Sequence, residues 1–364
     1  MLTATRNSFC SRAALTTSNY NLTFYFSPTK VGLKLCHKHG GNMKLIAPDY
    51  YTDFRCIADK CRHNCCIGWE IDIDEYTRSY YEEIIATKPE EIPSSFINRL
   101  SEGISYSDDT AYFRLAENER CPFLNKDNLC DIILTLGEDS LCSICTDHPR
   151  FRNYFTDRKE VGLGLCCEEA ARLILLKSDK TELCVLGDDN EAQTLSDEEQ
   201  KAIDMRNAVF EILQDRSVPF ESRLRKMTDY CGITLPQKSH AEWTDIFLSL
   251  ERLDDKWGEL LTKYRGFAPD EFDFTKLDRY DTCFEQLSVY LAFRYFSDGV
   301  LDNTADKTAA FIALCCNMIR NLFAAVMRSA VSSYLSDVLI EIVRMFSAEV
   351  EYSDCNIEQL MTVL

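Results

Sequence analysis

The chain has little glycine, proline and histidine for its length. It contains 13 glycines, 9 prolines and 5 histidines among 364 residues. No Gly-x-Gly-x-x-Gly, Walker-type, His-Glu-x-x-His or Gly-x-Ser-x-Gly sequence occurs, and Gly162-Leu-Gly164 is too short to count as one. These motifs contain the residues that bind phosphate, bind the metal or act as nucleophile in the commonest nucleotide-binding proteins, metalloproteases and serine hydrolases. We therefore expect none of those classes.

Basic residues are scarce relative to acidic ones. The chain has 40 Lys and Arg against 59 Asp and Glu, which gives a formal net charge of −19. A general binder of nucleic acid or anionic membranes needs an excess of positive charge, so we expect neither partner, and a basic protein fits better. The longest apolar stretch, Ala309–Met327, is interrupted by Asn and Arg, which indicates a buried helix and not a membrane span.

Residues 1–42 differ from the rest because they contain five basic residues and no acidic ones. The apolar stretch 22–26 is too short and too polar for a secretory signal, although the composition resembles that of an organelle transit peptide. Two glycine codons before Met43 can spell a bacterial ribosome-binding sequence. We therefore expect residues 1–42 to be a non-native or disordered leader, with translation starting at Met43 and the protein remaining in the cytoplasm.

Cysteine is the residue present in excess. Ten of the 18 cysteines lie between Cys56 and Cys167, in four groups. Short spacings allow several thiolates to converge on one soft ion at little cost in loop-closure entropy, so metal binding is the leading hypothesis. Disulfides are the alternative, but they belong to oxidising compartments and small coreless domains. The groups are Cys56/Cys61/Cys65/Cys66, Cys121/Cys130, Cys142/Cys145 and Cys166/Cys167.

The spacings do not identify the metal. Zinc and iron–sulfur clusters both accept four thiolates, and the surplus of thiols allows one cluster with additional redox-active thiols, or a binuclear site. The Cys-x3-Cys-x2-Cys loop of the radical S-adenosylmethionine type is missing, because Cys61-x3-Cys65 matches only part of it. We interpret His63 and His148 as polar loop residues. Seven of the eight cysteines outside the four groups are assigned other roles. Two belong to the leader, Cys10 and Cys36. Five are interpreted as small buried hydrophobic residues: Cys231, Cys283, Cys315, Cys316 and Cys355.

Local patterns predict several elements. Trp69, Ile71 and Ile73 alternate with acidic residues, which predicts a short half-buried strand followed by a helix. The segment 125–128 predicts a turn between two short strand-like pieces. A helix is expected to begin after Cys167, where the helix dipole would lower the pKa of that thiol.

The chain beyond Gly187 is dominated by helical patterns. Ser196 and Glu199 form a capping-box signature, and residues 284–296 predict a buried aromatic helix. An apolar stripe predicts a core-facing helix at 335–346. The expected fold is mainly α with a small irregular α+β cysteine-rich N-terminal metal-binding domain at 43–187 and a helical domain at 188–364.

Five ordered motifs lie between Met43 and Leu176. They are Tyr50–Cys56, Cys61–Trp69, Cys121–Cys130, Cys145–Arg150 and Cys167–Arg172. Together they resemble the FliB-like flagellin lysine-N-methylases of motile bacteria. A looser similarity covers Tyr290–Phe296, and a short zinc- or iron-chelating domain shares only the cysteine pattern. Two departures from the family pattern are Glu168, where proline is usual, and His148, where an aromatic residue is usual.

The resemblance implies an enzyme that transfers methyl groups from S-adenosylmethionine to surface lysines of flagellin and contains a four-iron, four-sulfur cluster, with zinc as the alternative. It implies eight metal ligands and makes Cys142 and Cys166 local additions. The ligands are Cys56, Cys61, Cys65, Cys66, Cys121, Cys130, Cys145 and Cys167.

Two other functions remain open at this stage. One is a non-enzymatic interaction protein that zinc or an iron–sulfur cluster stabilises, and the other is a redox-sensing or iron-sensing protein. For the enzyme, the acceptor lysine must lose its proton, which requires desolvation or a nearby base. With 59 acidic residues the sequence does not identify that base. An iron–sulfur centre with an open coordination position is our hypothesis for the anchor of S-adenosylmethionine.

Overall fold

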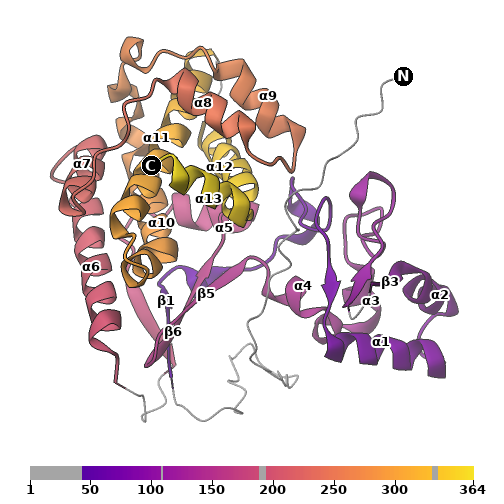
Figure 1. Cartoon of the computed structure of the whole chain (residues 1–364). Helices are drawn as coiled ribbons and strands as arrows, with labels where there is room; N and C mark the ends of the chain where they lie inside the picture. Colours follow the sequence, from indigo (N-terminus) through magenta and orange to yellow (C-terminus); the bar gives the residue numbers. More distant parts are fainter. Residues whose placement is uncertain (1–42, 108–109, 188–193, 330–334) are drawn as a thin grey trace.

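The computed structural model describes residues 43–107, 110–187, 194–329 and 335–364, so the expected leader at 1–42 lies outside the described residues. The described chain is mainly α-helical with a few short strands, as expected (Figure 1). The helices are α1 (Glu75–Thr87), α2 (Ser94–Gly103), α3 (Asp131–Leu136), α4 (Ser143–Asp147), α5 (Glu168–Leu175), α6 (Asp197–Leu213), α7 (Phe220–Tyr230), α8 (His240–Ser249), α9 (Asp255–Tyr264), α10 (Asp281–Leu301), α11 (Ala305–Ser329), α12 (Leu335–Phe346) and α13 (Asp354–Thr362). The strands are β1 (Lys44–Pro48), β2 (Asp72–Ile73), β3 (Ile104–Ser107), β4 (Thr110–Phe113), β5 (Arg150–Tyr154), β6 (Arg158–Leu163) and β7 (Leu183–Gly187).

A four-stranded sheet in the order β5-β6-β1-β7 joins the first described strand to three later ones. Strand β1 runs parallel to β6, with Lys44 opposite Arg158, and antiparallel to β7. Strands β5 and β6 are antiparallel neighbours. Because β6 leads directly into the segment before α5, this sheet fixes the position of Cys166 and Cys167 against the helices.

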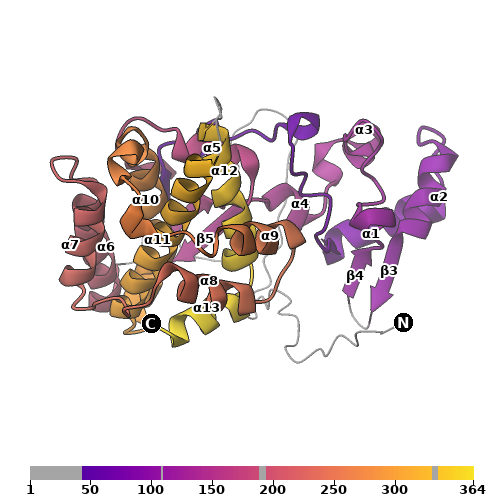
Figure 2. The same ribbon diagram turned by 90° about the horizontal axis from the view of Figure 1, so that it is seen from above.

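Residues 56–147 form a smaller lobe beside the larger, mostly helical body (Figures 1 and 2). The lobe contains the three-stranded sheet β2-β4-β3 and helices α1 to α4. Its own hydrophobic core includes Tyr81, Leu100, Phe113 and Phe123, all at most 2% exposed. Strand β2 is only two residues long, so the predicted alternating strand at Trp69–Ile73 is confirmed in shortened form, and α1 follows it as predicted.

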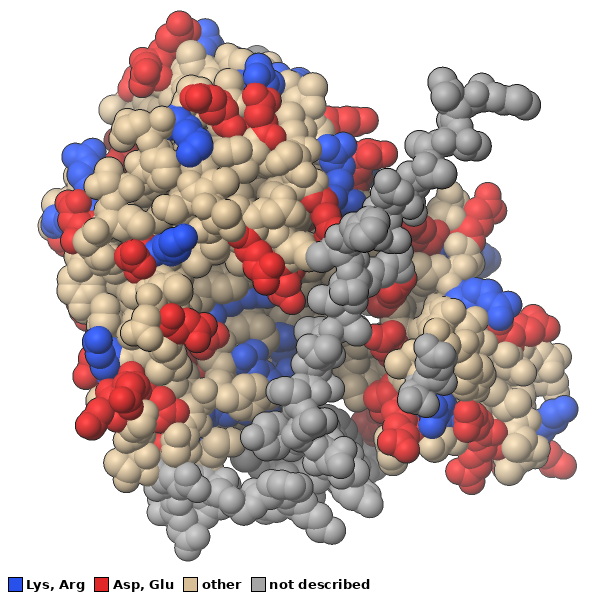
Figure 3. All heavy atoms as spheres, in the orientation of Figure 1, with Lys and Arg blue, Asp and Glu red and all other residues tan. Residues whose placement is uncertain are grey.

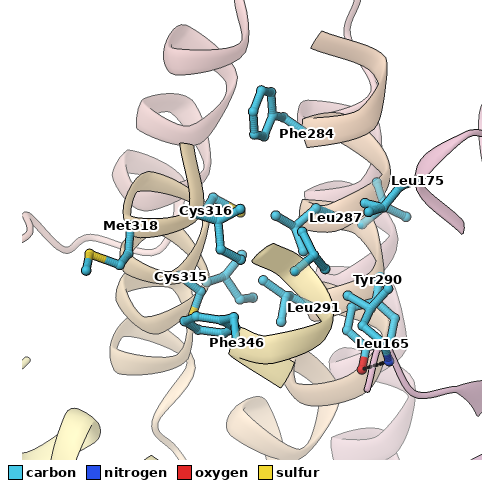
Figure 4. Packing of buried hydrophobic residues seen from close by; sticks show 14 of the residues in the cluster. Leu165, Leu175, Phe284, Leu287, Tyr290, Leu291, Cys315, Cys316, Met318 and Phe346 are labelled. Carbon is cyan, nitrogen blue, oxygen red and sulfur yellow. Dashed lines mark hydrogen bonds between the residues drawn. The ribbon is translucent and has the colours of Figure 1, made fainter. Parts of the chain in front are cut away.

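Helices α10 and α11 form the centre of the larger body. Leu287 and Leu291 on α10 lie across from Cys315 and Cys316 on α11 (Figure 4), and all four are at most 1% exposed. The interpretation of Cys315 and Cys316 as buried core residues is therefore confirmed. Helix α11 is long and apolar enough to cross a membrane, but 78% of its most apolar window is buried within the described protein. Such burial is typical of a core helix.

Helix ends and stripes follow the predictions closely. The capping box of Ser196 and Glu199 starts α6, with both reciprocal hydrogen bonds present. Helix α12 matches the predicted stripe, and α10 is the predicted aromatic helix. The turn at 125–128 is present, but the two strand-like pieces around it reduce to a single bridge between Leu124 and Cys130. That expectation was wrong because Cys130 already caps the short helix α3.

The main core crosses the expected boundary at Gly187. Tyr50, Phe54, Leu163 and Leu165 pack in the same cluster as the helices of the larger body. The backbone N–H of Leu165 donates to the Tyr290 hydroxyl at 3.4 Å, which ties the segment before α5 to α10 (Figure 4). The division into domains at 43–187 and 188–364 stays a prediction, and residues 188–193 lie outside the described residues.

Candidate functional site

The cysteines of the four groups lie in the smaller lobe and where it joins the larger body. All ten are free thiols. Cys121, Cys142 and Cys166 are buried, Cys56 and Cys65 are exposed, and the other five are half-buried. Since none of the ten is in a disulfide, the thiols remain available as ligands or nucleophiles.

Glu168 ties the loop around Cys61 to the start of α5. Its carboxylate accepts hydrogen bonds from the Arg62 backbone N–H at 2.8 Å and from Arg62 Nε at 2.6 Å. The Cys61 thiol lies 3.7 Å from Glu168 Oε2 and donates to the His63 carbonyl at 3.1 Å. Glu168 therefore holds two cysteine groups together across more than a hundred positions of sequence.

Cys167 is the N-cap residue of α5, as the predicted helix start requires. Burial raises the pKa of its thiol to about 11, although backbone N–H groups of Ala170 and Glu169 donate to the sulfur and act in the opposite direction. The expectation of a lowered pKa at this helix end was wrong. Loss of hydration on burial outweighs the favourable amide dipoles here.

Three further cysteines are connected through the backbone of the smaller lobe. The N–H of Cys121 donates to the Cys66 carbonyl at 2.8 Å, and the bridge between Leu124 and Cys130 closes the following turn. Backbone N–H groups of Phe123 and Leu124 donate to the Cys121 sulfur, while burial raises its pKa to about 12. The sulfur of Cys130 lies in electrostatic range of Cys145.

Helix α4 brings Cys142 and Cys145 to the same place. The two thiols hydrogen-bond to each other, and this bond and burial raise the pKa of Cys145 well above its ordinary value. Asp74 anchors the helix, because its carboxylate accepts from the N–H of Ser143 at 2.8 Å and from that of Thr77 at 3.1 Å. Burial alone would raise the pKa of Asp74, but these hydrogen bonds hold it below its usual value.

Thiols are the ligand type that thiophilic metals prefer, and several of these thiols lie near one another. They do not, however, converge on a single point. Within the described ranges, no three His, Cys, Asp or Glu side chains are placed to hold a metal ion. S–H hydrogen bonds between neighbours, such as that of Cys65 with Cys66, satisfy several thiols instead. The eight predicted ligands and the identity of the metal therefore stay predictions.

The two histidines near the cysteines lie at the junction of lobe and body. His63 Nε2 is 3.0 Å from Glu341 Oε1 on α12. The ring of His148 packs near Trp69, with 6.4 Å between ring centroids. Burial, together with the nearby Arg150, lowers the pKa of His148 to about 4.

A buried polar cluster adjoins the cysteines and was not anticipated from the sequence. Glu351 is 4% exposed and accepts from the hydroxyls of Tyr290 at 2.9 Å and Tyr295 at 3.0 Å. Arg294 lies 3.4 Å from the same carboxylate oxygen and donates to Tyr290 at 2.8 Å. The other oxygen, Oε1, has no hydrogen-bond partner in the described part of the chain. Glu351 ends a π-helical turn at Ser347–Glu351, a geometry frequent at functional sites.

Tyr352 connects this polar cluster to the cysteines. Its ring packs edge-on against Trp69 of the smaller lobe at 5.4 Å and lies under the Arg294 guanidinium. Its hydroxyl hydrogen-bonds with the Cys166 thiol. The same hydroxyl would be only 2.3 Å from a β-carbon at position 164, so the contact requires Gly164.

One residue of the buried polar cluster, Arg294, could have been noticed from the sequence. Arg294 is a charged residue within an apolar aromatic helix, and such a residue is either paired or functional. Glu351 carried no such signal, because many acidic residues follow apolar stretches in this chain. Its burial depends on the contact between α10 and the π-helical turn, which sequence periodicity does not reveal.

Part of the chain is similar to known lysine-N-methylases. Over 132 residues it is 30% identical to the lysine-N-methylases of Salmonella choleraesuis (strain SC-B67) and Salmonella typhimurium (strain LT2), a match covering 36% of this chain and 32% of each relative. Over 132 residues it is 29% identical to the flagellar biosynthetic protein FliU of Salmonella muenchen, of which 77% is covered. The match thus spans about a third of the length of the lysine-N-methylases. No family model and no solved structure matches the chain.

Proposed function

We propose that the chain is a protein lysine N-methyltransferase that transfers methyl groups from S-adenosylmethionine to surface lysines of flagellin in the bacterial cytoplasm. The observation that carries the proposal is the 30% identity to lysine-N-methylases over 132 residues. The similarity to a flagellar biosynthetic protein supports flagellin as the substrate. The similarity to lysine-N-methylases favours an enzyme over the non-enzymatic and redox-sensing alternatives.

A thiolate-bound metal centre is part of the proposal. The free thiols gathered near the junction support it, and the eight cysteines implied by the resemblance would be its ligands. An iron–sulfur centre of the four-iron, four-sulfur kind, or zinc as the alternative, would hold the amino-acid end of S-adenosylmethionine if one of its coordination positions is left open by the protein.

Glu351 is the residue whose chemistry best suits the proton transfer in this proposal. A lysine ε-ammonium must lose a proton before its nitrogen can attack the methyl carbon of the sulfonium. The carboxylate would take that proton; the nitrogen then gains the methyl group and the sulfur keeps the electron pair of the broken bond. Oε1 of Glu351 is buried and has no hydrogen-bond partner among the described residues, so it can accept this proton once a lysine reaches it, and the tyrosines on Oε2 hold the carboxylate in position.

The test is the intact mass of flagellin after co-expression with the full chain. We expect a gain of whole methyl units that is absent without the chain. Glu351→Gln should lower the methylation rate by about 10²–10⁴-fold, the usual contribution of a general base. Glu349→Gln is the matched control, because Glu349 lies in the same π-helical turn but accepts from the backbone N–H groups of Leu253 and Asp254. An unchanged flagellin mass with the wild-type chain would refute the proposal.

A further inference from the structure

Helix α4 holds two cysteines within a single turn. Cys142 is its N-cap residue, and Cys145 lies three positions further along the chain. We infer that Cys142 and Cys145 form a reversible disulfide, so that the smaller lobe contains a redox-active site. The inference goes beyond the proposed function and requires neither flagellin nor S-adenosylmethionine nor a bound metal.

The backbone of this turn sets a separation that a disulfide can bridge. The Thr146 N–H donates to the Cys142 carbonyl at 3.0 Å, which closes the turn around both cysteines. Residues three apart in a regular helical turn have Cα atoms about 5 Å apart, and disulfides usually join Cα atoms about 4.4–6.8 Å apart. Adjacent cysteines such as Cys65 and Cys66 have Cα atoms only about 3.8 Å apart. The geometry therefore favours the pair in α4 over the adjacent pairs of the chain.

Side chains around Cys142 hold the pair in place. The two thiols hydrogen-bond to each other, and Cys142 also hydrogen-bonds with the Tyr81 hydroxyl. That hydroxyl donates to the Ser140 carbonyl at 2.5 Å. On the other side, Asp74 accepts from the backbone N–H of the residue that follows Cys142 at 2.8 Å. The chain is thus fixed before and after Cys142, and the two sulfurs are neighbours in the reduced protein.

The pair can be reached from one side. Cys142 is buried in the core of the smaller lobe, whereas Cys145 is half-buried. Ser143, Ile144 and Thr146 are exposed, so this turn lies at the surface. Helix α4 lies on the side of the lobe that faces the larger body (Figures 1 and 2). A small disulfide can therefore approach Cys145, and Cys142 lies behind it to complete the exchange.

The oxidant is a low-molecular-weight disulfide such as glutathione disulfide. One protein thiol loses its proton, and its sulfur attacks the small disulfide and releases one small thiol. The second protein thiol then loses its proton, its sulfur attacks the sulfur of the mixed disulfide, and the second small thiol leaves. The two protein thiols are oxidised to one disulfide, and the small disulfide is reduced to two thiols. A dithiol reductant reverses both steps.

Oxidation changes which thiols of the lobe are available. Cys145 interacts electrostatically with the thiols of Cys66, Cys121 and Cys130. It is one of the eight cysteines that the resemblance implies as ligands, and Cys142 is not. The disulfide withdraws Cys145 from its neighbours, and reduction returns it, so Cys142 controls the availability of that thiol.

Thiol mapping of the full chain tests the inference. The reduced chain is incubated with glutathione disulfide, unfolded and alkylated, and the alkylated positions are located by tandem mass spectrometry. We expect Cys142 and Cys145 to escape alkylation together and to be joined to each other, while the buried Cys121 and Cys166 are alkylated. Dithiothreitol should restore both thiols.

Two variants separate disulfide formation from simple protection by burial. In Cys142→Ser the second thiol is missing, so Cys145 should accumulate as a mixed disulfide with glutathione. In Cys145→Ser the buried Cys142 should stay a free thiol. Cys130→Ser is the matched control, because Cys130 also lies in electrostatic range of Cys145, and it should keep the disulfide. Circular dichroism identifies a variant that fails to fold, and the map of the wild-type chain requires no variant.

Three results would overturn the inference. Free thiols at both positions after treatment would show that the pair is not oxidised. A stable glutathione adduct on Cys145 of the wild-type chain would show that Cys142 does not reach it. A disulfide between Cys145 and another cysteine would show that a different pair is redox-active. Because no flagellin is present in these measurements, they leave the proposed function untouched, and a failure of flagellin methylation leaves the disulfide standing.

Discussion

At the scale of single residues, Gly164 leaves no room for a side chain where the end of strand β6 meets Tyr352, the residue after the π-helical turn. A β-carbon there would lie 2.3 Å from the Tyr352 hydroxyl and 3.1 Å from the Pro149 carbonyl. We expect Gly164→Ala to lower the free energy of unfolding by about 1–3 kcal/mol, the usual cost of overpacking. Urea denaturation measures the change.

Two variants check that explanation. Gly266→Ala is the control, because a β-carbon at Gly266 meets no atom within 4 Å, and its effect should be small. Tyr352→Phe removes the atom nearest to position 164, so Gly164→Ala should cost less in that background. Equal costs in the two backgrounds would contradict the close contact.

His148 gives a prediction about acid stability. Burial and Arg150 lower its pKa to about 4 from the ordinary 6.5. Between these values the unfolded chain binds a proton that the folded chain does not, so this residue makes the folded state less stable as the pH falls from 6.5 to 4. Thermal unfolding across this range should show a decrease in stability that His148→Phe reduces.

The phenylalanine variant is a suitable comparison because it keeps a ring that can pack near Trp69 but has no group that binds a proton. Other acidic groups titrate in both proteins, and the difference between the two curves isolates His148. Parallel curves from pH 7 to pH 4 would mean that the ring is hydrated in the folded protein.

At the scale of elements, a buried ion pair joins helix α6 to strand β6. Arg206 is 1% exposed; its guanidinium donates to Glu160 Oε1 at 3.0 Å and also bonds to Oε2. Arg206→Met should lower the free energy of unfolding by about 3–5 kcal/mol, because it leaves a buried carboxylate without its partner. Chemical denaturation measures this loss.

The paired replacement separates the cost of breaking the ion pair from its net contribution. Arg206→Met combined with Glu160→Leu removes both charges and should be markedly more stable than Arg206→Met alone. The rings of Phe210 and Phe293 already pack around the guanidinium and can receive an apolar side chain. If the double variant were as unstable as the single one, the pair would matter for packing and not for charge.

Elements stabilised by local interactions could be predicted from the sequence, and elements that depend on distant contacts could not. The capping box at Ser196 and the stripe of α12 depend on residues within a turn or two, and both are present. Strand β1 pairs with residues more than a hundred positions away, and no periodicity marks that partner. The same holds for the site. The short spacings of the cysteines could be recognised in the sequence, whereas the burial of Glu351 depends on its contact with α10 and could not be predicted.

At the scale of the whole molecule, the negative charge is concentrated in the smaller lobe. Residues 56–147 contain 19 acidic and 8 basic residues, so about a quarter of the chain carries −11 of the total −19. Acidic side chains are spread over this lobe on the face shown in Figure 3. Helix α1 adds exposed Tyr76 and Tyr80 beside exposed Glu75 and Glu83, and aromatic rings with carboxylates attract lysine side chains.

If the substrate is a protein modified at its lysines, this lobe should govern the encounter. Raising the salt concentration should slow association with flagellin, because charges farther apart than about 8 Å are screened at physiological ionic strength. Glu75→Gln with Glu83→Gln should reduce both the association rate and its salt dependence. Glu259→Gln with Glu358→Gln removes the same charge from exposed positions of the larger body and should have less effect. Equal effects of the two pairs would show that only the net charge of the protein attracts flagellin, and that the smaller lobe does not direct it.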